Sequence, residues 1–178
     1  RQLMGKVGIV AAFGGVGSVI FVRPAFGFQP TADILFQFKA GVVGTKSNSF
    51  HINKMIELLE KAVNEKPDTQ LVVFPELATT GYECGEKFNE LAEVIDDKSE
   101  TVQAFSKVAL KHNIHIVLGM AERDANDPEI LYNSQLFISN KGEIIGTYRK
   151  IHLFDTEKDW FTAGTEYKVF DTEIGRIG

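Results

Sequence analysis

The sequence is poor in the residues that make disulfides and zinc sites. It has one cysteine, Cys84, and four histidines in 178 residues. A single cysteine cannot form an internal disulfide, and no Cys/His cluster at metal-ligand spacing occurs along the chain. These absences argue against a disulfide-stabilised scaffold and a zinc finger, and they favour a reducing, cytoplasmic setting.

The chain also lacks a strong excess of charge of either sign. It carries 24 acidic and 19 basic residues, a net charge of −5. This balance offers no basic surface for nucleic acid or for an anionic membrane, so small molecules are the expected partners. With 44% hydrophobic and 24% charged residues, the composition is that of a soluble globular protein.

An uncharged, glycine-rich apolar run from Val7 to Val22 dominates the first 33 residues. Its length suits a secretory signal segment and is short for a membrane-spanning helix, which needs about 20 apolar residues. Its glycines weaken any helix, and Ile20 stands where the last glycine of a dinucleotide-binding pattern would be. A secretory leader, a buried hairpin and an unfolded leader all stay open for residues 1–33, and we place the folded domain at residues 34–178.

From residue 35 onward, hydrophobic periodicity predicts alternating strands and helices. The strand–helix–strand order, with a hairpin signal at residues 140–142, predicts an α/β fold with a mixed sheet and helices on at least one face. A further helix is expected after Cys84, with Leu91, Val94 and Ile95 on its apolar side. The other predicted elements are strands at 35–43, 71–74, 115–120, 131–139 and 143–148 and helices at 48–64 and 100–112.

Two charged residues that follow predicted strands form a candidate pair for acid–base chemistry. Glu76 follows the apolar residues 71–74, and Lys150 follows Tyr148 and Arg149. If both side chains converge at strand ends, the glutamate can shuttle protons while the lysine stabilises developing negative charge. Taken singly, each residue is explained as well by a solvated surface charge, so the case rests on the pair and its surroundings.

The surrounding motif segments are LVVFPEL at 71–77, TGY at 80–82, GMAE at 119–122, LYNS at 131–134 and YRKIHLF at 148–154. Together they resemble the nitrilase superfamily of carbon–nitrogen hydrolases. The resemblance covers residues 36–178, and it implies a four-layer αββα sandwich of which residues 34–178 supply the N-terminal part, the first half.

The resemblance also implies roles for individual residues. Glu76 matches the general base, Lys150 the lysine that polarises the tetrahedral intermediate, and Glu157 the second active-site glutamate, with Asp155 its nearest rival. The family's cysteine nucleophile is expected beyond Gly178, so residues 1–178 are expected to be inactive alone. No metal or organic cofactor is implied. Cys84 is a poor candidate nucleophile, because nothing near it in the sequence supplies a base or oxyanion donors.

Three further residues are candidates for substrate contact. Tyr82 and Trp160 follow strand ends, where aromatic side chains often line a pocket, although core packing or a subunit contact explains them equally well. His152 lies two residues after Lys150 and could touch substrate or serve as a structural histidine.

The expected substrate is a small amide, N-carbamoyl compound or nitrile. One alternative is a glutaminase-type domain that supplies ammonia to a synthetase, because residues 81–88 resemble the corresponding loop of such domains. Another is a non-catalytic fragment, because half a sandwich would leave strand edges and an apolar sheet face uncovered. The family resemblance and that exposed surface both favour a homo-oligomer.

Overall fold

The computed structural model describes residues 17–23, 31–38 and 48–178, with side chains described from Ser49 onward. Its elements in chain order are β1 (Gly17–Arg23), β2 (Thr31–Phe38), α1 (Asn48–Glu65), β3 (Leu71–Val73), the 3₁₀ helix η1 (Gly85–Lys87), α2 (Phe88–Leu91), α3 (Glu100–His112), β4 (His115–Arg123), β5 (Leu131–Ile138), β6 (Ile144–Arg149), the 3₁₀ helix η2 (Asp155–Asp159), β7 (Phe170–Thr172) and β8 (Gly175–Ile177).

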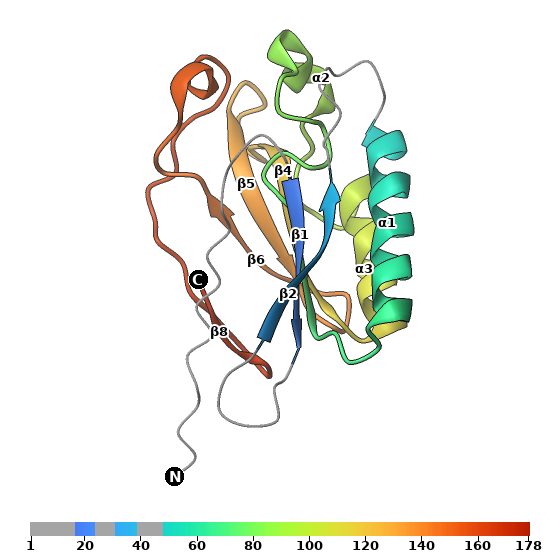
Figure 1. The fold of residues 1–178 in the computed structure, drawn as a ribbon. Coiled ribbons are helices and arrows are strands. Elements are labelled where there is room, and N and C mark those ends of the chain that lie inside the picture. The colour runs from blue at the N-terminus through green and yellow to red at the C-terminus, as the bar shows by residue number, and fades with distance from the viewer. Residues whose placement is uncertain (1–16, 24–30, 39–47) are drawn as a thin grey trace.

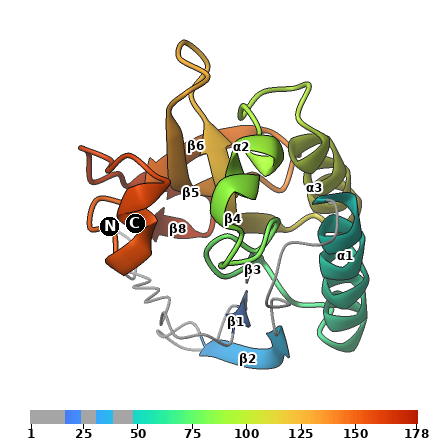
Figure 2. The same cartoon turned by 90° about the horizontal axis from the view of Figure 1, so that it is seen from above.

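The larger sheet is mixed and has six strands in the order β2-β1-β3-β4-β5-β6. β3 and β4 pair in parallel, and the other neighbouring pairs are antiparallel. Helices α1 and α3 lie side by side on one face, while the β7–β8 hairpin lies on the opposite side (Figures 1 and 2). The predicted α/β fold with a mixed sheet and helices on one face is confirmed.

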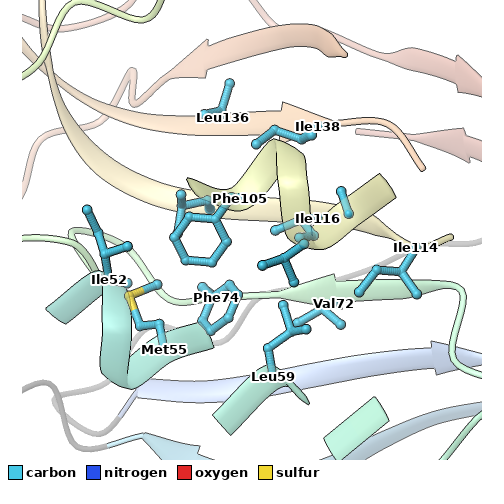
Figure 3. Packing of buried hydrophobic residues seen from close by; sticks show 14 of the residues in the cluster. Ile52, Met55, Leu59, Val72, Phe74, Phe105, Ile114, Ile116, Leu136 and Ile138 are labelled. Atoms are coloured by element: carbon cyan, nitrogen blue, oxygen red, sulfur yellow. The ribbon is translucent and has the colours of Figure 1, made fainter. Parts of the chain in front are cut away.

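The main core lies between the two long helices and the sheet (Figure 3). Around β3, alternate side chains point to opposite faces: Val72 and Phe74 pack toward the helices, and Leu71 and Val73 pack on the hairpin side. Phe74 meets Phe105 of α3 edge-on, with ring centroids 5.5 Å apart. Helix α1 contributes its apolar stripe to this core through Ile52, Met55, Leu59, Ala62 and Val63.

Helix α3 is closed by side chains at its start and by backbone conformation at its end. Ser99 Oγ accepts a hydrogen bond from the Val102 N–H at 3.1 Å, and Asn113 ends the helix in the left-handed conformation at φ +54°. Upstream, the Glu93 carboxylate accepts bonds from Ser99 Oγ at 2.6 Å and Thr101 N–H at 3.2 Å.

The helix expected after Cys84 is shorter than predicted. It ends at Leu91, because Ala92 is extended and Glu93 forms a bridge with Glu122 of β4. The prediction that Val94 and Ile95 belong to this helix was therefore wrong. The hydrogen bonds that the Glu93 carboxylate accepts at the start of α3 compete with continuation of the helix. They hold the chain at Glu93 in a non-helical conformation.

The other predicted elements are found within a few residues of their expected ends. The strand predicted at 35–43 is found as β2, and its residues 39–43 lie outside the described residues. Residues 17–23 form β1, between β2 and β3, and the boundary at residue 33 falls within β2. The assignment of residues 1–33 as a leader stays a prediction. In the described ranges, no helix is long and apolar enough to cross a membrane.

Leucine truncations on the two helices test the core. Leu59 on α1 is fully buried, whereas Leu110 on α3 is 62% exposed. We expect Leu59→Ala to lower the free energy of unfolding of the full-length protein by about 2–5 kcal/mol. The matched Leu110→Ala should change it by less than about 0.5 kcal/mol. Urea denaturation measures both, and equal losses in the two variants would contradict this packing.

Candidate active site

The sheet topology brings three polar side chains to one end of the sheet. Strand β3 is parallel to β4, β4 is antiparallel to β5, and β5 is antiparallel to β6. Strands β3 and β6 therefore run in the same direction. Glu76 follows the end of β3 and Lys150 follows the end of β6. Asn133 lies near the start of β5, which runs the other way, so all three reach the same end.

Glu76, Lys150 and Glu157 form one ion-paired group, which we call the Glu–Lys–Glu cluster. Lys150 Nζ lies 2.9 Å from Glu76 Oε2 and 2.8 Å from Glu157 Oε1. Asn133 Nδ2 donates to the same two oxygens, at 3.1 Å and 3.4 Å respectively. The Tyr82 hydroxyl donates to Glu157 Oε1 at 2.9 Å. A single ammonium thus sits between two carboxylates that share one amide.

The second glutamate is held by its own turn. Glu157 is 3% exposed, and its other oxygen accepts the Phe154 N–H at 2.8 Å, which closes the first turn of η2. Asp155, the rival for this position, is exposed and sits at φ +43°. The structure therefore brings Glu157, and not Asp155, to Lys150.

The pKa values of Glu157 and Lys150 both shift in the direction that favours the charged form. Burial by itself would raise the pKa of Glu157, but hydrogen bonds from Lys150, Phe154 N–H and Tyr82 outweigh it, and the pKa lies below its ordinary value. Burial would lower the pKa of Lys150, yet its bonds to Glu157 and Glu76 raise it. Burial beside Glu157 also raises the pKa of Tyr82. Lys150 is therefore a stable cation at neutral pH.

Two glycines let backbone segments approach closely at this end of the sheet. A Cβ on Gly119 of β4 would lie 2.1 Å from the Pro75 carbonyl oxygen and 2.5 Å from Glu76 Cα. A Cβ on Gly164 would lie 2.2 Å from the Arg149 carbonyl oxygen, and the Gly164 N–H donates to Lys150 O at 2.9 Å. Only glycine fits at either place, so each fixes the backbone of one charged residue of the cluster.

The turn after Glu76 is strained. Leu77 has φ +50°, in the left-handed region that a side chain such as leucine rarely adopts, at a cost on the order of 1–3 kcal/mol. Its buried side chain packs with Phe88 and Phe161, and its carbonyl accepts the Gly81 N–H at 2.7 Å. These contacts hold the strained turn in place and with it the direction of Glu76.

A cavity of about 560 Å³ adjoins the cluster on the side of η1 and η2. Tyr82 and Trp160, two of the predicted substrate-contact residues, line it together with Glu157 and Phe154. Tyr82 joins cavity and cluster, because its hydroxyl bonds to Glu157. His152, the third predicted contact, is exposed and is not part of this lining, so its role stays a prediction.

Cys84 lies in an apolar environment near this cavity. It is buried with Leu77 and Phe88, and its thiol donates to the carbonyl oxygens of Thr80 at 3.3 Å and Gly81 at 3.4 Å. Acceptors of this kind favour the neutral thiol over the thiolate that a nucleophile needs.

No group of three or more potential metal ligands occurs within the residues that the structure describes. At the cluster, Lys150 Nζ already occupies the position between the two carboxylates that a metal cation would need. The side chains of the cluster offer proton transfer by a carboxylate and stabilisation of negative charge by an ammonium.

Sequence reasoning missed Asn133 as a member of the site and missed the bond between Tyr82 and Glu157. Asn133 lies in a segment that the sequence singled out, at 131–134, but an isolated asparagine gives no sign of its partners. Its position beside Glu76 follows from the pairing of β5 with β4 and β6. That pairing is a long-range property of the sheet.

The family model for carbon–nitrogen hydrolases matches residues 39–178. The chain belongs to this family. A probable nitrilase of Schizosaccharomyces pombe is 36% identical over 128 residues, which are 72% of this chain and 47% of the relative. The omega-amidase NIT3 of Saccharomyces cerevisiae is 30% identical over 139 residues, again 72% of this chain and 47% of the relative.

The carbon–nitrogen hydrolase fold is matched in solved structures as well. The crystal structure of Saccharomyces cerevisiae Nit3, a member of branch 10 of the nitrilase superfamily, superposes with a TM-score of 0.70 at 26% identity, over 92% of this chain and 54% of that chain. The nitrilase fold predicted from the sequence is confirmed. The chain spans about half the length of the curated relatives it matches.

The pH dependence of stability tests the ion pair of Glu157. Because its pKa is lowered in the folded state, its charge contributes stability that is present above the unfolded-state pKa of about 4.3 and is lost as the pH falls through the folded-state value. We expect Glu157→Gln to be less stable than the wild type at neutral pH. The difference in free energy of unfolding should shrink below about pH 4.

Urea denaturation of the full-length protein at a series of pH values measures this difference. Glu166→Gln is the control, since Glu166 is 72% exposed and lies 3.8 Å from Lys168. Its difference from the wild type should stay small throughout. A Glu157→Gln penalty of the same size in acid and at neutral pH would contradict the ion pair.

Proposed function

We propose that this protein hydrolyses the C–N bond of a small amide or N-carbamoyl substrate by acyl transfer to a cysteine that follows Gly178. The observation that carries the proposal is the Glu–Lys–Glu cluster, in which Lys150 lies within 2.9 Å of both carboxylates at the end of the sheet. Membership of the carbon–nitrogen hydrolase family and the similarity to an omega-amidase support the same reaction class.

In the proposed reaction, Glu76 accepts the proton of the cysteine thiol as the thiolate attacks the substrate carbonyl carbon. The tetrahedral intermediate carries negative charge on its oxygen, which the ammonium of Lys150 stabilises. A positioned donor of this kind contributes about 3 kcal/mol. The C–N bond then breaks as Glu76 gives its proton to the leaving nitrogen, so that ammonia or an amine departs and a thioester remains.

Water completes the cycle. Glu76 takes a proton from the water that attacks the thioester carbon, and the proton returns to the thiolate as the carboxylic acid leaves. Glu157 does not exchange protons in this scheme. It holds Lys150 as a cation and in position, with Asn133 and Tyr82 directed at the same carboxylate oxygen.

The cavity beside Glu157 is the proposed place for the substrate's side chain. Tyr82 and Trp160 line it, and Tyr82 offers its ring, because its hydroxyl is already bonded to Glu157. We assign His152 to the outer part of the substrate path because it is exposed two residues after Lys150. A cytoplasmic homo-oligomer is proposed from the composition and the family resemblance.

The proposal is tested by reading the coding sequence past Gly178 and assaying the whole protein. Ammonia release is measured with an ω-amide of a dicarboxylic acid, an N-carbamoyl amino acid, an aliphatic nitrile and glutamine. We expect turnover of the ω-amide or the N-carbamoyl compound, and none after the downstream cysteine is changed to alanine. Turnover of glutamine alone would indicate the glutaminase alternative, and an inactive protein without that cysteine would overturn the proposal.

The same assay shows whether residues 1–178 act alone. We propose that they do not, because the nucleophile of the scheme lies outside them. Ammonia release by residues 1–178 at a rate close to that of the whole protein would contradict the assignment of the cysteine.

Lys150→Ala tests the oxyanion role. Loss of the ammonium should lower kcat for the substrate that the panel identifies by about 10²–10³-fold. Lys111→Ala is the matched control, since Lys111 also forms an ion pair, with Glu60 at 2.6 Å, but on the exposed surface. Its kcat should equal that of the wild type. A Lys150→Ala enzyme within a few-fold of wild-type kcat would remove Lys150 from the mechanism.

A further inference from the structure

A second charged cluster lies next to Lys150 in sequence but is not used by the proposed chemistry. Its centre is Arg149, the last residue of β6. Arg149 Nε lies 3.1 Å and 3.2 Å from the two oxygens of Glu122, and its Nη2 lies 2.5 Å from Glu122 Oε1. The same Nη2 donates to Asp124 Oδ2 at 3.2 Å, and the guanidinium lies 3.7 Å from the centre of the Tyr132 ring.

Glu122 is buried and hydrogen-bonded. It is 5% exposed, and Ser134 Oγ donates to its Oε2 at 2.5 Å. A buried carboxylate of this kind is costly without a cation, so Glu122 and Arg149 each depend on the other. The guanidinium is thus clamped by two carboxylates on β4 and just after it, and by an aromatic ring on β5.

The register of the sheet shows what this clamp does to Lys150. Arg149 pairs with Ser134, and Glu122 pairs with Tyr132, so these four side chains share one face of the sheet. Successive residues of a strand point to opposite faces. With Arg149 fixed on its face, the next residue, Lys150, emerges on the other face, where it reaches Glu76 and Glu157.

The backbone of Lys150 is also hydrogen-bonded on both sides. The Lys150 N–H donates to Asn133 O at 2.8 Å, and the Lys150 carbonyl accepts the Gly164 N–H at 2.9 Å. These bonds hold the position of the chain. The contacts of Arg149, the preceding residue, with Glu122, Asp124 and Tyr132 hold its side chain on the opposite face.

We propose that Arg149, held by Glu122, is a positioning residue that sets the direction of Lys150 toward the substrate. The inference rests on the proposed function, since it assigns Lys150 to the oxyanion. Arginine suits the role because its planar fork contacts both oxygens of Glu122 and stacks on Tyr132 at once, which a lysine ammonium cannot do.

Kinetics of three variants of the full-length enzyme test the proposal: Arg149→Lys, Glu122→Gln and the double variant. Displacement of a catalytic group by about 1 Å costs up to about 10²-fold, so kcat should fall by about 10–10²-fold in each single variant while KM changes little. Arg149→Lys keeps the charge and is still expected to lose activity. The double variant should lose no more than the worse single variant, because the two residues act as a unit.

Leu59→Ala is the control for a purely structural effect. Like the Arg149 and Glu122 variants, it should lower the melting temperature. Unlike them, it should leave kcat unchanged at a temperature well below melting, because Leu59 lies in the helix-side core. If Arg149→Lys and Glu122→Gln also keep wild-type kcat while they are folded, the positioning role is overturned.

A chemical readout separates this inference from the proposed function. Acylation of Lys150 by an amine-directed reagent at fixed pH, followed by mass spectrometry of its peptide, reports how firmly the ammonium is held. We expect labelling to be several-fold faster in Glu122→Gln and in Arg149→Gln than in the wild type. Faster labelling of the two variants, with no turnover of any substrate by the wild type, would refute the proposed function. It would still support the inference that Arg149 and Glu122 position Lys150. Unchanged labelling of Lys150 in both variants would refute the inference that Arg149 and Glu122 position it.

Discussion

The active-site end of the sheet depends on one partly buried group of ion pairs, in which Lys150 lies between Glu76 and Glu157. A half-buried ammonium is unfavourable without partners, and two carboxylates near each other repel unless a cation lies between them. Here each group offsets the penalty of the others, and Asn133 supplies further hydrogen bonds to both carboxylates. Lys150 is therefore the cation on which both carboxylates depend, and it stays paired with Glu157 when the charge of Glu76 alone is removed.

Other residues at this end of the sheet hold the backbone that carries the cluster in place. Gly119 lets the backbone of Glu76 lie against β4, and Gly164 lets a later segment lie against the carbonyl of Arg149. Leu77 holds a left-handed turn after Glu76 through its buried contacts. Rigid strand ends and close backbone contacts give a charged cluster the fixed geometry that electrostatic catalysis uses.

The sequence predicted helices α1 and α3 and the mixed sheet, because hydrophobic periodicity is a local property. The distinctive motif segments singled out Glu76, Lys150 and Glu157, which the structure brings within hydrogen-bond distance of one another through Lys150. It did not predict Asn133 beside Glu76, or Arg149 clamped by Glu122, because these contacts arise from strand register across the sheet. The helix after Cys84 was extended too far since apolar spacing at Val94 and Ile95 does not reveal that Glu93 bonds to the start of α3.

The most direct test of the proposed mechanism is the kcat of Glu76→Gln in the whole protein. Glutamine keeps the size of the side chain and an oxygen for Lys150 and Asn133, but it cannot take up a proton. If Glu76 is the base for both half-reactions, kcat should fall by about 10²–10⁴-fold while the unfolding transition stays close to that of the wild type. A folded Glu76→Gln enzyme with kcat near the wild-type value would show that Glu76 is not the general base.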